Sequence, residues 1–230
     1  MPEVEIVCLA NSRKIGDRCV AGLRTDGQGW IRPVTDSTSG GLTYRNYTLD
    51  NGRPAELLDV IRLTLSTPKP EVFQPENWIV ASDRWRFIRK LSHGEASRIL
   101  ASFRVVGPDL FGNQSDRIAL TSLTVNPASA SLALVEPRQL EWQVTTNINN
   151  RRQTRASFLL GGCQYSLVVT DSVWHAKLRD LSFDLGYYSN EQCGVRAQDR
   201  ILLTVSLGQP LSGGDCYKLV AGVVVLEAEG

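Results

Sequence analysis

The chain has 230 residues, of which 42% are hydrophobic and 21% are charged, so its composition is that of a globular protein and excludes a disordered chain. Its 25 basic and 24 acidic residues give a net charge of +1. A dedicated DNA-binding protein usually has a large basic excess, so a nucleic-acid site in this chain requires a local cluster of basic residues.

The start of the chain has no basic segment followed by a long apolar stretch, so we expect no signal peptide. The longest apolar candidate, residues 219–226, has the length of a strand and is too short to span a membrane. The five cysteines include no Cys-x-x-Cys pair and the two histidines are distant in sequence, which predicts no metal site. An odd number of cysteines without a secretion signal favours reduced thiols, so we expect a cytoplasmic protein without a cofactor.

In chain order, the first half contains short apolar segments that are rich in β-branched residues and bounded by turn residues. We expect strands over residues 4–10, 19–24, 29–34 and 57–66, and shorter ones over 78–80 and 85–88. An Asp-Gly pair at 26–27 predicts a hairpin turn. Ser92 and Glu95 form a capping-box pattern before an apolar helical face, which predicts a helix over 93–103.

Residues 107–130 are rich in Gly, Pro, Asn and Ser, which is typical of a connection, although 117–125 also fit a strand. The second half predicts a helix over 172–181 and strands over 131–135, 140–145, 154–160, 165–170, 201–207 and 217–227. We therefore predict a mainly β protein with a few short helices and two domains, residues 1–128 and 129–230.

One internal match favours a duplication. Residues 59–70 align without gaps to residues 199–210, with six identities in twelve positions. The alternative is that two unrelated strands share a common pattern. A duplicated β unit of roughly 100 residues would naturally form a small closed barrel, because closure removes exposed strand edges.

Three stretches mix polar, Trp and Gly positions that a generic strand does not need. They are residues 9–14 with 18–22 and 30–34, residues 165–171 with Trp174, and residues 205–210 with 216–222. Together they resemble a bacterial family described as dual OB-containing domains, over nearly the whole chain.

The resemblance implies two OB-like β-barrels in tandem, in proteins that are accessory components of bacterial defence or mobile-element systems. It carries over no catalytic residue. OB folds commonly bind single-stranded nucleic acid or other oligomeric ligands on one barrel face. By analogy of fold, we expect a ligand-binding protein.

The first candidate ligand-binding residues are Asn11, Ser12, Arg13 and Lys14, which follow a buried strand. A turn with amide, hydroxyl and two cationic groups suits a phosphate or a carboxylate. The alternative is a solvated turn in which Asn11 and Ser12 bond their own backbone.

Trp30 and Arg32 alternate along a predicted strand and therefore share one face. On an open barrel face they would form a stacking platform for a base. The alternative is that Trp30 closes the core and Arg32 pairs with an acid.

Arg84 and Arg86 flank Trp85 in the most nucleic-acid-like cluster of the chain, and a second basic patch comprises Arg151, Arg152 and Arg155. For the first cluster, the plain explanation is a charged outer strand face over a buried aromatic face. The second patch is expected on a loop, where such runs are usually solvated.

Asp171, Trp174 and Lys177 follow a predicted strand, where they would line a pocket at the end of a barrel. The alternative for Asp171 is a helix cap. The sequence contains no Gly-rich phosphate loop, no Gly-x-Ser-x-Gly and no His-Glu-x-x-His, so we expect no enzyme and name no catalytic or metal-binding residue.

Three functions remain open at this point. The chain is expected to bind single-stranded nucleic acid, a small nucleotide-like or other anionic metabolite, or a protein partner. The near-neutral charge weighs mildly against the first, and the polar character of the shared turns weighs mildly against the third.

Overall fold

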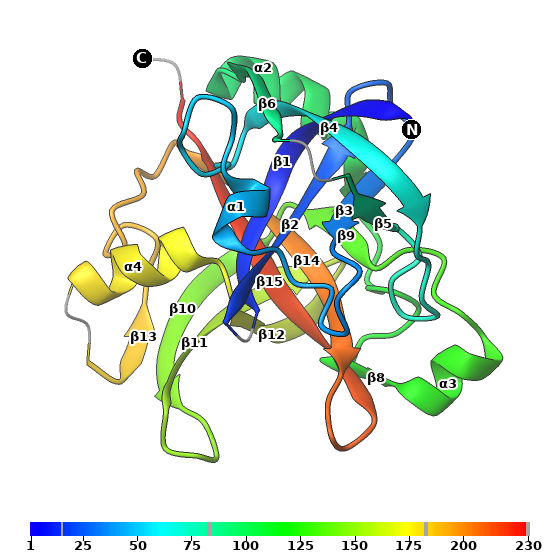
Figure 1. Cartoon of the computed structure of the whole chain (residues 1–230). Coiled ribbons are helices and arrows are strands. Elements are labelled where there is room, and N and C mark those ends of the chain that lie inside the picture. The colour runs from blue at the N-terminus through cyan, green and yellow to red at the C-terminus, as the bar shows by residue number, and fades with distance from the viewer. Residues whose placement is uncertain (15, 82–83, 182–183, 229–230) are drawn as a thin grey trace.

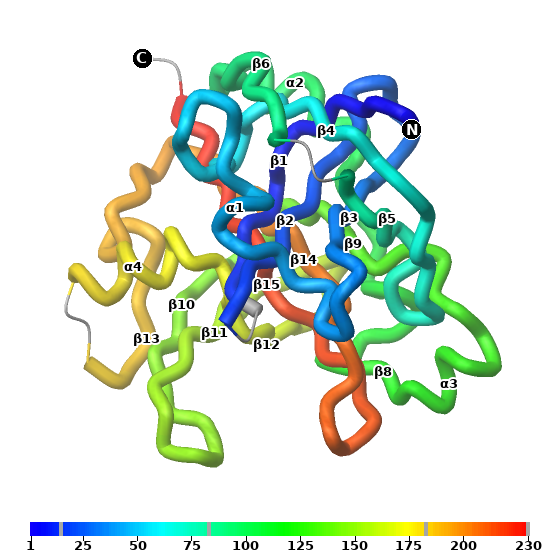
Figure 2. The backbone as a smooth tube through the Cα atoms, viewed as in Figure 1, coloured from blue at the N-terminus to red at the C-terminus, as the bar shows by residue number. Residues whose placement is uncertain are grey.

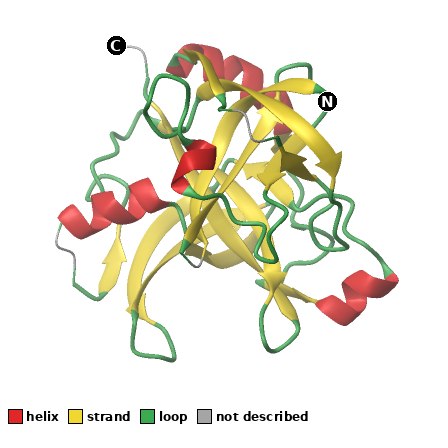
Figure 3. Cartoon of the chain, in the orientation of Figure 1, coloured by secondary structure: helices red, strands yellow, loops and turns green. Residues whose placement is uncertain are grey.

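The computed structural model describes residues 1–14, 16–81, 84–181 and 184–228, without the side chain of Lys14. Strands form most of the ordered structure, and the helices lie at the periphery of the sheets (Figure 3). The predicted mainly β fold is confirmed.

The first sheet contains a closed five-stranded barrel. Its strands are β1 (Glu3–Lys14), β2 (Asp17–Arg24), β3 (Trp30–Val34), β4 (Asp59–Pro68) and β5 (Asn77–Val80). They are arranged in the order β1-β2-β3-β5-β4, and β4 pairs again with β1. Strand β1 closes the barrel because residues 3–7 pair with β4 while residues 6–14 pair with β2.

Three further elements belong to this first lobe. Strand β6 (Arg86–Lys90) pairs with β4 outside the barrel, and helix α1 (Tyr44–Tyr47) packs near β2. Helix α2 (His93–Leu100) begins at Ser92, whose hydroxyl accepts from the Glu95 backbone N–H while Glu95 accepts from the Ser92 N–H. The predicted capping box is confirmed, and the last turn of the predicted helix is a 3-10 helix, Ala101–Phe103.

The second sheet repeats the strand order of the first. Its main strands are β10 (Arg138–Thr146), β11 (Arg152–Leu160), β12 (Cys163–Val169), β14 (Arg200–Pro210) and β15 (Asp215–Leu226). They lie in the order β10-β11-β12-β15-β14. The β12–β15 pair is parallel, as is the β3–β5 pair of the first barrel.

The pair that corresponds to β1–β4 is made by a separate strand. Strand β9 (Leu132–Val135) pairs with β14, and β10 follows after Glu136 and Pro137. Proline has no N–H for a strand ladder, so this dipeptide divides the first strand of the second unit into β9 and β10. The two elements together occupy the position that β1 has in the first barrel.

The internal match found in the sequence joins strands of equivalent position. Residues 59–70 contain β4 and residues 199–210 contain β14, and each is the fourth strand of its five-strand unit. Unrelated strands would have no reason to fall at the same place in the strand order. The topology therefore supports the duplication.

The connection between the units contains regular structure. Strand β7 (Arg104–Val105) pairs with β9, and β8 (Arg117–Ala119) pairs with β15 before helix α3 (Leu120–Val125). Residues 117–125 are thus a short strand and a helix, whereas the sequence suggested one strand. We refer to β1–β6 as the first lobe and to β7–β15 as the second; the boundary at residue 128 stays a prediction.

Helix α4 (Ser172–Asp180) and the edge strand β13 (Gly186–Tyr188) complete the second lobe. The core of this lobe is an apolar cluster around Trp142, Phe158 and Leu203, and the core of the first lobe gathers around Ile6, Ile61 and Trp85. Each lobe therefore has its own interior.

The lobes are also joined by a third apolar cluster, in which Leu9 and Leu23 of the first lobe pack with Leu202 and Val224 of the second. A β-bulge at residues 8–10 leaves the Leu9 carbonyl outside the β1–β2 register. This carbonyl accepts a 2.7 Å hydrogen bond from the Thr204 hydroxyl, and a Cβ atom at Gly222 would lie 2.1 Å from the same oxygen. Only glycine allows β15 to approach β1 this closely.

Two hairpins of the second lobe project from the same side of the molecule (Figure 1). Their turns are residues 147–151, between β10 and β11, and residues 211–214, between β14 and β15. We call them the hairpin tips. Both chain ends lie at the opposite side, as the backbone trace shows (Figure 2).

Candidate functional site

A cleft of about 600 Å³ lies between the lobes on the side of the hairpin tips. Its walls are the β1–β2 hairpin of the first lobe, strands β11 and β12, and both tips of the second lobe. We call it the interlobe cleft. The lining residues that matter most for its chemistry are Ser12, Arg13, Arg32, Asp116, Ile148, Arg155, Leu211, Tyr217 and Lys218.

The cleft lies where an OB barrel usually holds its ligand. In OB folds the binding surface is the face of the second and third strands, flanked by the loops that join strands 1 to 2 and 4 to 5. In the second lobe these parts are β11, β12 and the two hairpin tips. The cleft uses all four of them and adds the β1–β2 hairpin from the other lobe.

The corresponding face of the first lobe is covered. Arg32 of β3 is 2% exposed, and its guanidinium donates to the hydroxyls of Ser131 (2.8 Å) and Ser206 (3.2 Å) in the second lobe. Trp30 is half-buried against the apolar clusters between the lobes. The two predicted stacking residues therefore lie in or beside the contact between lobes, and Arg32 also lines the inner end of the cleft.

The charge in the cleft is predominantly positive. Arg13, Arg32, Arg155 and Lys218 line it, whereas Asp116 is the only carboxylate among its described lining residues. Arg13 is exposed, and its guanidinium has no hydrogen-bond or ion-pair partner within the described part of the chain. An unpaired cation at the edge of a cleft is available to an anionic ligand.

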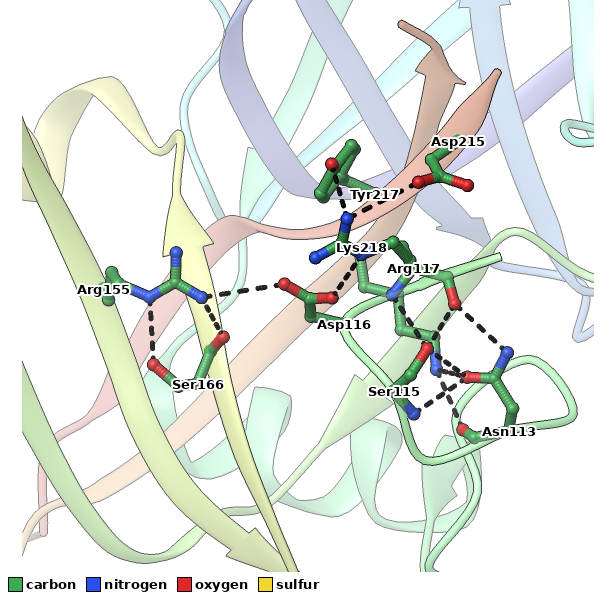
Figure 4. A network of polar contacts seen from close by, with 9 residues as sticks. All are labelled: Asn113, Ser115, Asp116, Arg117, Arg155, Ser166, Asp215, Tyr217 and Lys218. Carbon is green, nitrogen blue, oxygen red and sulfur yellow. Dashed lines mark hydrogen bonds and ion pairs between the residues drawn. The ribbon is translucent and has the colours of Figure 1, made fainter. Parts of the chain in front are cut away.

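Arg155 is held in place by its neighbours in the sheet. Its Nε donates to the Ser166 hydroxyl on β12 at 3.0 Å, and its Nη2 lies 4.0 Å from the Asp116 carboxylate. Asp116 also accepts from the Arg117 Nε at 2.9 Å, so its carboxylate lies between two guanidinium groups (Figure 4). The guanidinium of Arg155 is thus pre-oriented and only weakly neutralised.

Lys218 supplies a cation from inside the protein. Its side chain is 1% exposed, and the ammonium donates to the carbonyl and the side-chain oxygen of Asn113 at 2.8 and 2.6 Å (Figure 4). Burial lowers its pKa to about 8, because removal from water disfavours the charged form. At neutral pH the ammonium is still mainly protonated and ties the segment before β8 to β15.

Residues 11–14 do not form the expected turn, because β1 continues to Lys14 and these residues pair with β2. Ser12 and Arg13 line the cleft, whereas Asn11 donates its side-chain N–H to the Ala55 carbonyl at 2.7 Å. The Arg13 backbone N–H donates to the carbonyl of Thr170 in the second lobe. The side chain of Lys14 lies outside the described part of the structure.

Of the three candidate residues after β12, Asp171 caps helix α4, and Trp174 and Lys177 lie within that helix. Asp171 is buried, and its carboxylate accepts from the backbone N–H groups of Val173 and Trp174 in α4 and of Val223 in β15. Burial raises its pKa, the three hydrogen bonds acting in the opposite direction. Trp174 is buried beside Trp142, with the ammonium of Lys177 5.0 Å from its ring centre.

Arg84 and Arg86 are exposed outside the cleft, beside and on β6, while Trp85 between them is buried in the first barrel. Exposed arginines on either side of a buried tryptophan agree with the plain explanation of this cluster, a charged outer face over a buried aromatic face. The structure thus brings Ser12, Arg13 and Arg32 together in the cleft and leaves Arg84, Arg86, Asp171, Trp174 and Lys177 outside its lining.

The second lobe contributes two cations to the cleft, Arg155 and Lys218, and neither is among the candidate ligand-binding residues named from the sequence. The basic patch that contains Arg155 is expected on a loop, although Arg155 also falls within the strand predicted over residues 154–160. It lies on β11, where Gln153, Arg155 and Ser157 alternate with buried positions. That alternation is visible in the sequence. Lys218 also has a sequence signal, because it is the one charged residue between Tyr217 and Val225 in an apolar strand.

A second cavity has a lining of opposite charge to that of the interlobe cleft. It measures about 670 Å³ and lies around residues 136–141 and 189–201. Four carboxylates line it against one cation, Arg200; they are Glu136, Glu141, Glu191 and Asp199. Glu136 is paired with Arg104 and Arg200, and Asp199 with Arg196, yet the described lining of this cavity is mainly acidic where that of the interlobe cleft is mainly basic.

Fold and cleft together define a protein built from two OB-type units. The family model of the dual OB-containing domain matches residues 4–223, and the chain belongs to this family. No match was found among the curated proteins. Among solved structures, the chain is similar to one titled "Crystal structure of the tetrameric p202 HIN2", with 9% identity and a TM-score of 0.29 over 98% of this chain and 92% of that chain. So distant a likeness supports no argument.

The helices are short and lie at the periphery of the sheets. Among the described residues, none of them has both the length and the apolar character needed to cross a bilayer.

Proposed function

We propose that the protein binds single-stranded nucleic acid in the interlobe cleft and catalyses no reaction. The observation that carries the proposal is the charge of the cleft on the usual binding surface of an OB barrel: its described lining contains one carboxylate and four cations, of which Arg32 and Lys218 are buried. Phosphate neutralisation by Arg and Lys provides most of the affinity in such sites.

The near-neutral net charge of the chain is compatible with this function because the cations are concentrated. Arg13 and Arg155 stand on opposite lobes, so a strand that lies in the cleft meets basic groups on both sides. The rest of the described lining is mixed: it includes polar side chains such as Gln153 and apolar ones such as Val168 and Leu219, and Tyr217 is its one aromatic residue. Binding should therefore depend on the phosphates and be tolerant of sequence.

The test is fluorescence anisotropy with labelled single-stranded and duplex oligonucleotides across a range of salt concentrations. Arg13→Gln/Arg155→Gln should weaken binding and lower the slope of log K against log salt by about one for each phosphate that is no longer neutralised. Arg84→Gln/Arg86→Gln is the matched control, because it removes the same charge outside the cleft.

Two results would overturn the proposal. One is the absence of binding by the wild type even at low salt. The other is an equal decrease of affinity in the control pair, which would place the bound strand on β6 or make its binding nonspecific. Circular dichroism confirms that each variant is folded.

The second candidate is a small nucleotide-like or other anionic metabolite. The volume of about 600 Å³ favours it, since pockets for small molecules are commonly about 300–1,000 Å³. A mononucleotide that raises the thermal midpoint while oligonucleotides fail to bind would support this alternative, since ligand binding stabilises the folded state by mass action. A protein partner, a bacterial defence or mobile-element role and a cytoplasmic location stay predictions.

A further inference from the structure

The edge of the interlobe cleft is apolar where the hairpin tips reach it. Ile148 lies on the tip between β10 and β11 and is 102% exposed, and Leu211 lies on the tip between β14 and β15 and is 59% exposed. Both line the cleft. A single exposed apolar residue is ordinary, but two of them on the two walls of one basic cleft form a pattern.

Each tip is held by hydrogen bonds. The Asn147 side chain accepts from the backbone N–H groups of Asn149 and Arg151, and the backbone closes the turn between Asn147 and Arg151. In the other tip, Leu211 donates to the Asp215 carbonyl and accepts from the Gly214 N–H. The two apolar side chains therefore stand on ordered turns, which lowers the entropic cost of a contact.

The two walls and the interior of the cleft differ in chemistry. Arg155 and Lys218 belong to the strands that form its interior, whereas Ile148 and Leu211 lie at the turns. A nucleic-acid strand has the same division, with an anionic backbone on one side and apolar base faces on the other. Charge complementarity orients the strand, because its phosphates are attracted to the cations.

We propose that a single strand lies with its phosphates toward Arg13 and Arg155 and with its bases against Ile148 and Leu211. This inference rests on the proposed function and adds the orientation of the ligand. It also predicts a preference for single strands, because the base faces of a duplex are stacked on one another and closed to side chains. Contact with two aliphatic side chains makes no hydrogen bond and is tolerant of sequence.

The test uses Ile148→Ala/Leu211→Ala and two labelled probes of equal length, a single-stranded oligonucleotide and its abasic counterpart, which keeps the phosphates. The control variant is Val106→Ala/Val125→Ala, which removes exposed apolar groups away from the tips. We expect the tip variant to bind the base-carrying strand about fivefold more weakly or worse, with an unchanged salt slope. It should bind the abasic strand as the wild type does.

The outcomes separate this inference from the proposed function. If the wild type binds neither probe, the proposed function fails and this orientation fails with it. If the wild type shows salt-sensitive binding that the tip variant retains in full, or if the variant binds the abasic probe more weakly to the same degree, only the orientation is wrong. A concentration-dependent dimer that the tip variant abolishes would instead assign the tips to a second copy of the chain and overturn the inference.

Discussion

Replacing Gly222 by alanine tests whether the close approach of β15 to β1 joins the lobes. A Cβ atom at this position would lie 2.1 Å from the Leu9 carbonyl oxygen and 3.1 Å from its carbon. Both are backbone atoms, so no side-chain rotation relieves the clash, and the strands must separate by roughly 1 Å to restore an ordinary carbon–oxygen contact.

The expected cost has two parts. Overpacking of this kind costs about 1–3 kcal/mol, and separation of the strands stretches the Thr204–Leu9 hydrogen bond, which contributes about 1 kcal/mol. We expect the free energy of unfolding to fall by roughly 2–4 kcal/mol. For a chain of this size the thermal midpoint should fall by roughly 5–15 °C.

Urea and thermal unfolding, followed by circular dichroism, measure the effect. The matched control is Gly213→Ala in the turn before β15, where a Cβ atom has open space and the backbone φ is ordinary. The control should be neutral or slightly stabilising. If Gly222→Ala unfolds within about 0.5 kcal/mol of the wild type, the close approach is not a constraint and the reasoning is refuted.

Three further predictions concern the site and its support. Burial lowers the pKa of Lys218 to about 8, so the folded state holds fewer protons than the unfolded state between pH 8 and 10.5, and stability should rise with pH across that window. In urea titrations at pH 7.5, 9 and 10.5, the free energy of unfolding of Lys218→Met should lack this rise. If wild type and variant change in parallel with pH, Lys218 is not the group responsible. Asp116→Asn should raise oligonucleotide affinity about two- to fivefold in anisotropy by removing a competitor for Arg155, whereas Asp36→Asn, outside the cleft, should not; equal effects would point to net charge alone. Asp171→Ala should lower the free energy of unfolding in urea by roughly 2–4 kcal/mol, since three backbone N–H groups lose their acceptor, and an effect no larger than that of the exposed Asp180→Ala would count against this role.

Much of the local structure was predictable because it depends on neighbours in the chain. The alternation in residues 59–66 predicts the strand that is observed as β4 (Asp59–Pro68), and the Ser92–Glu95 pair predicts the start of α2. The short elements α1, β7 and β13 were not predicted. Strands and helices of two to four residues carry too few positions for a periodic pattern.

The candidate site was only partly predictable, because a strand pattern tells which residues share a face but not what covers it. Trp30 and Arg32 share a face as expected, yet the second lobe lies on that face. Arg155 and Ser157 also share a strand face, but in the second lobe this face is not covered: Arg155 lines the interlobe cleft and Ser157 lines the acidic second cavity. The same pattern thus has two outcomes, and a contact between distant segments decides between them.

The sequence by itself determined the mainly β class and the membership of the dual OB-containing family, and it favoured a duplication, since these follow from periodic patterns and motifs within continuous stretches. Only the tertiary structure decided which barrel face stays open and which cations gather in one cleft. Arg13 and Arg155 are 142 positions apart in the chain (155 minus 13) and line the same cleft because the lobes pack through Leu9, Thr204 and Gly222. Such proximity depends on packing between surfaces, which no local pattern encodes.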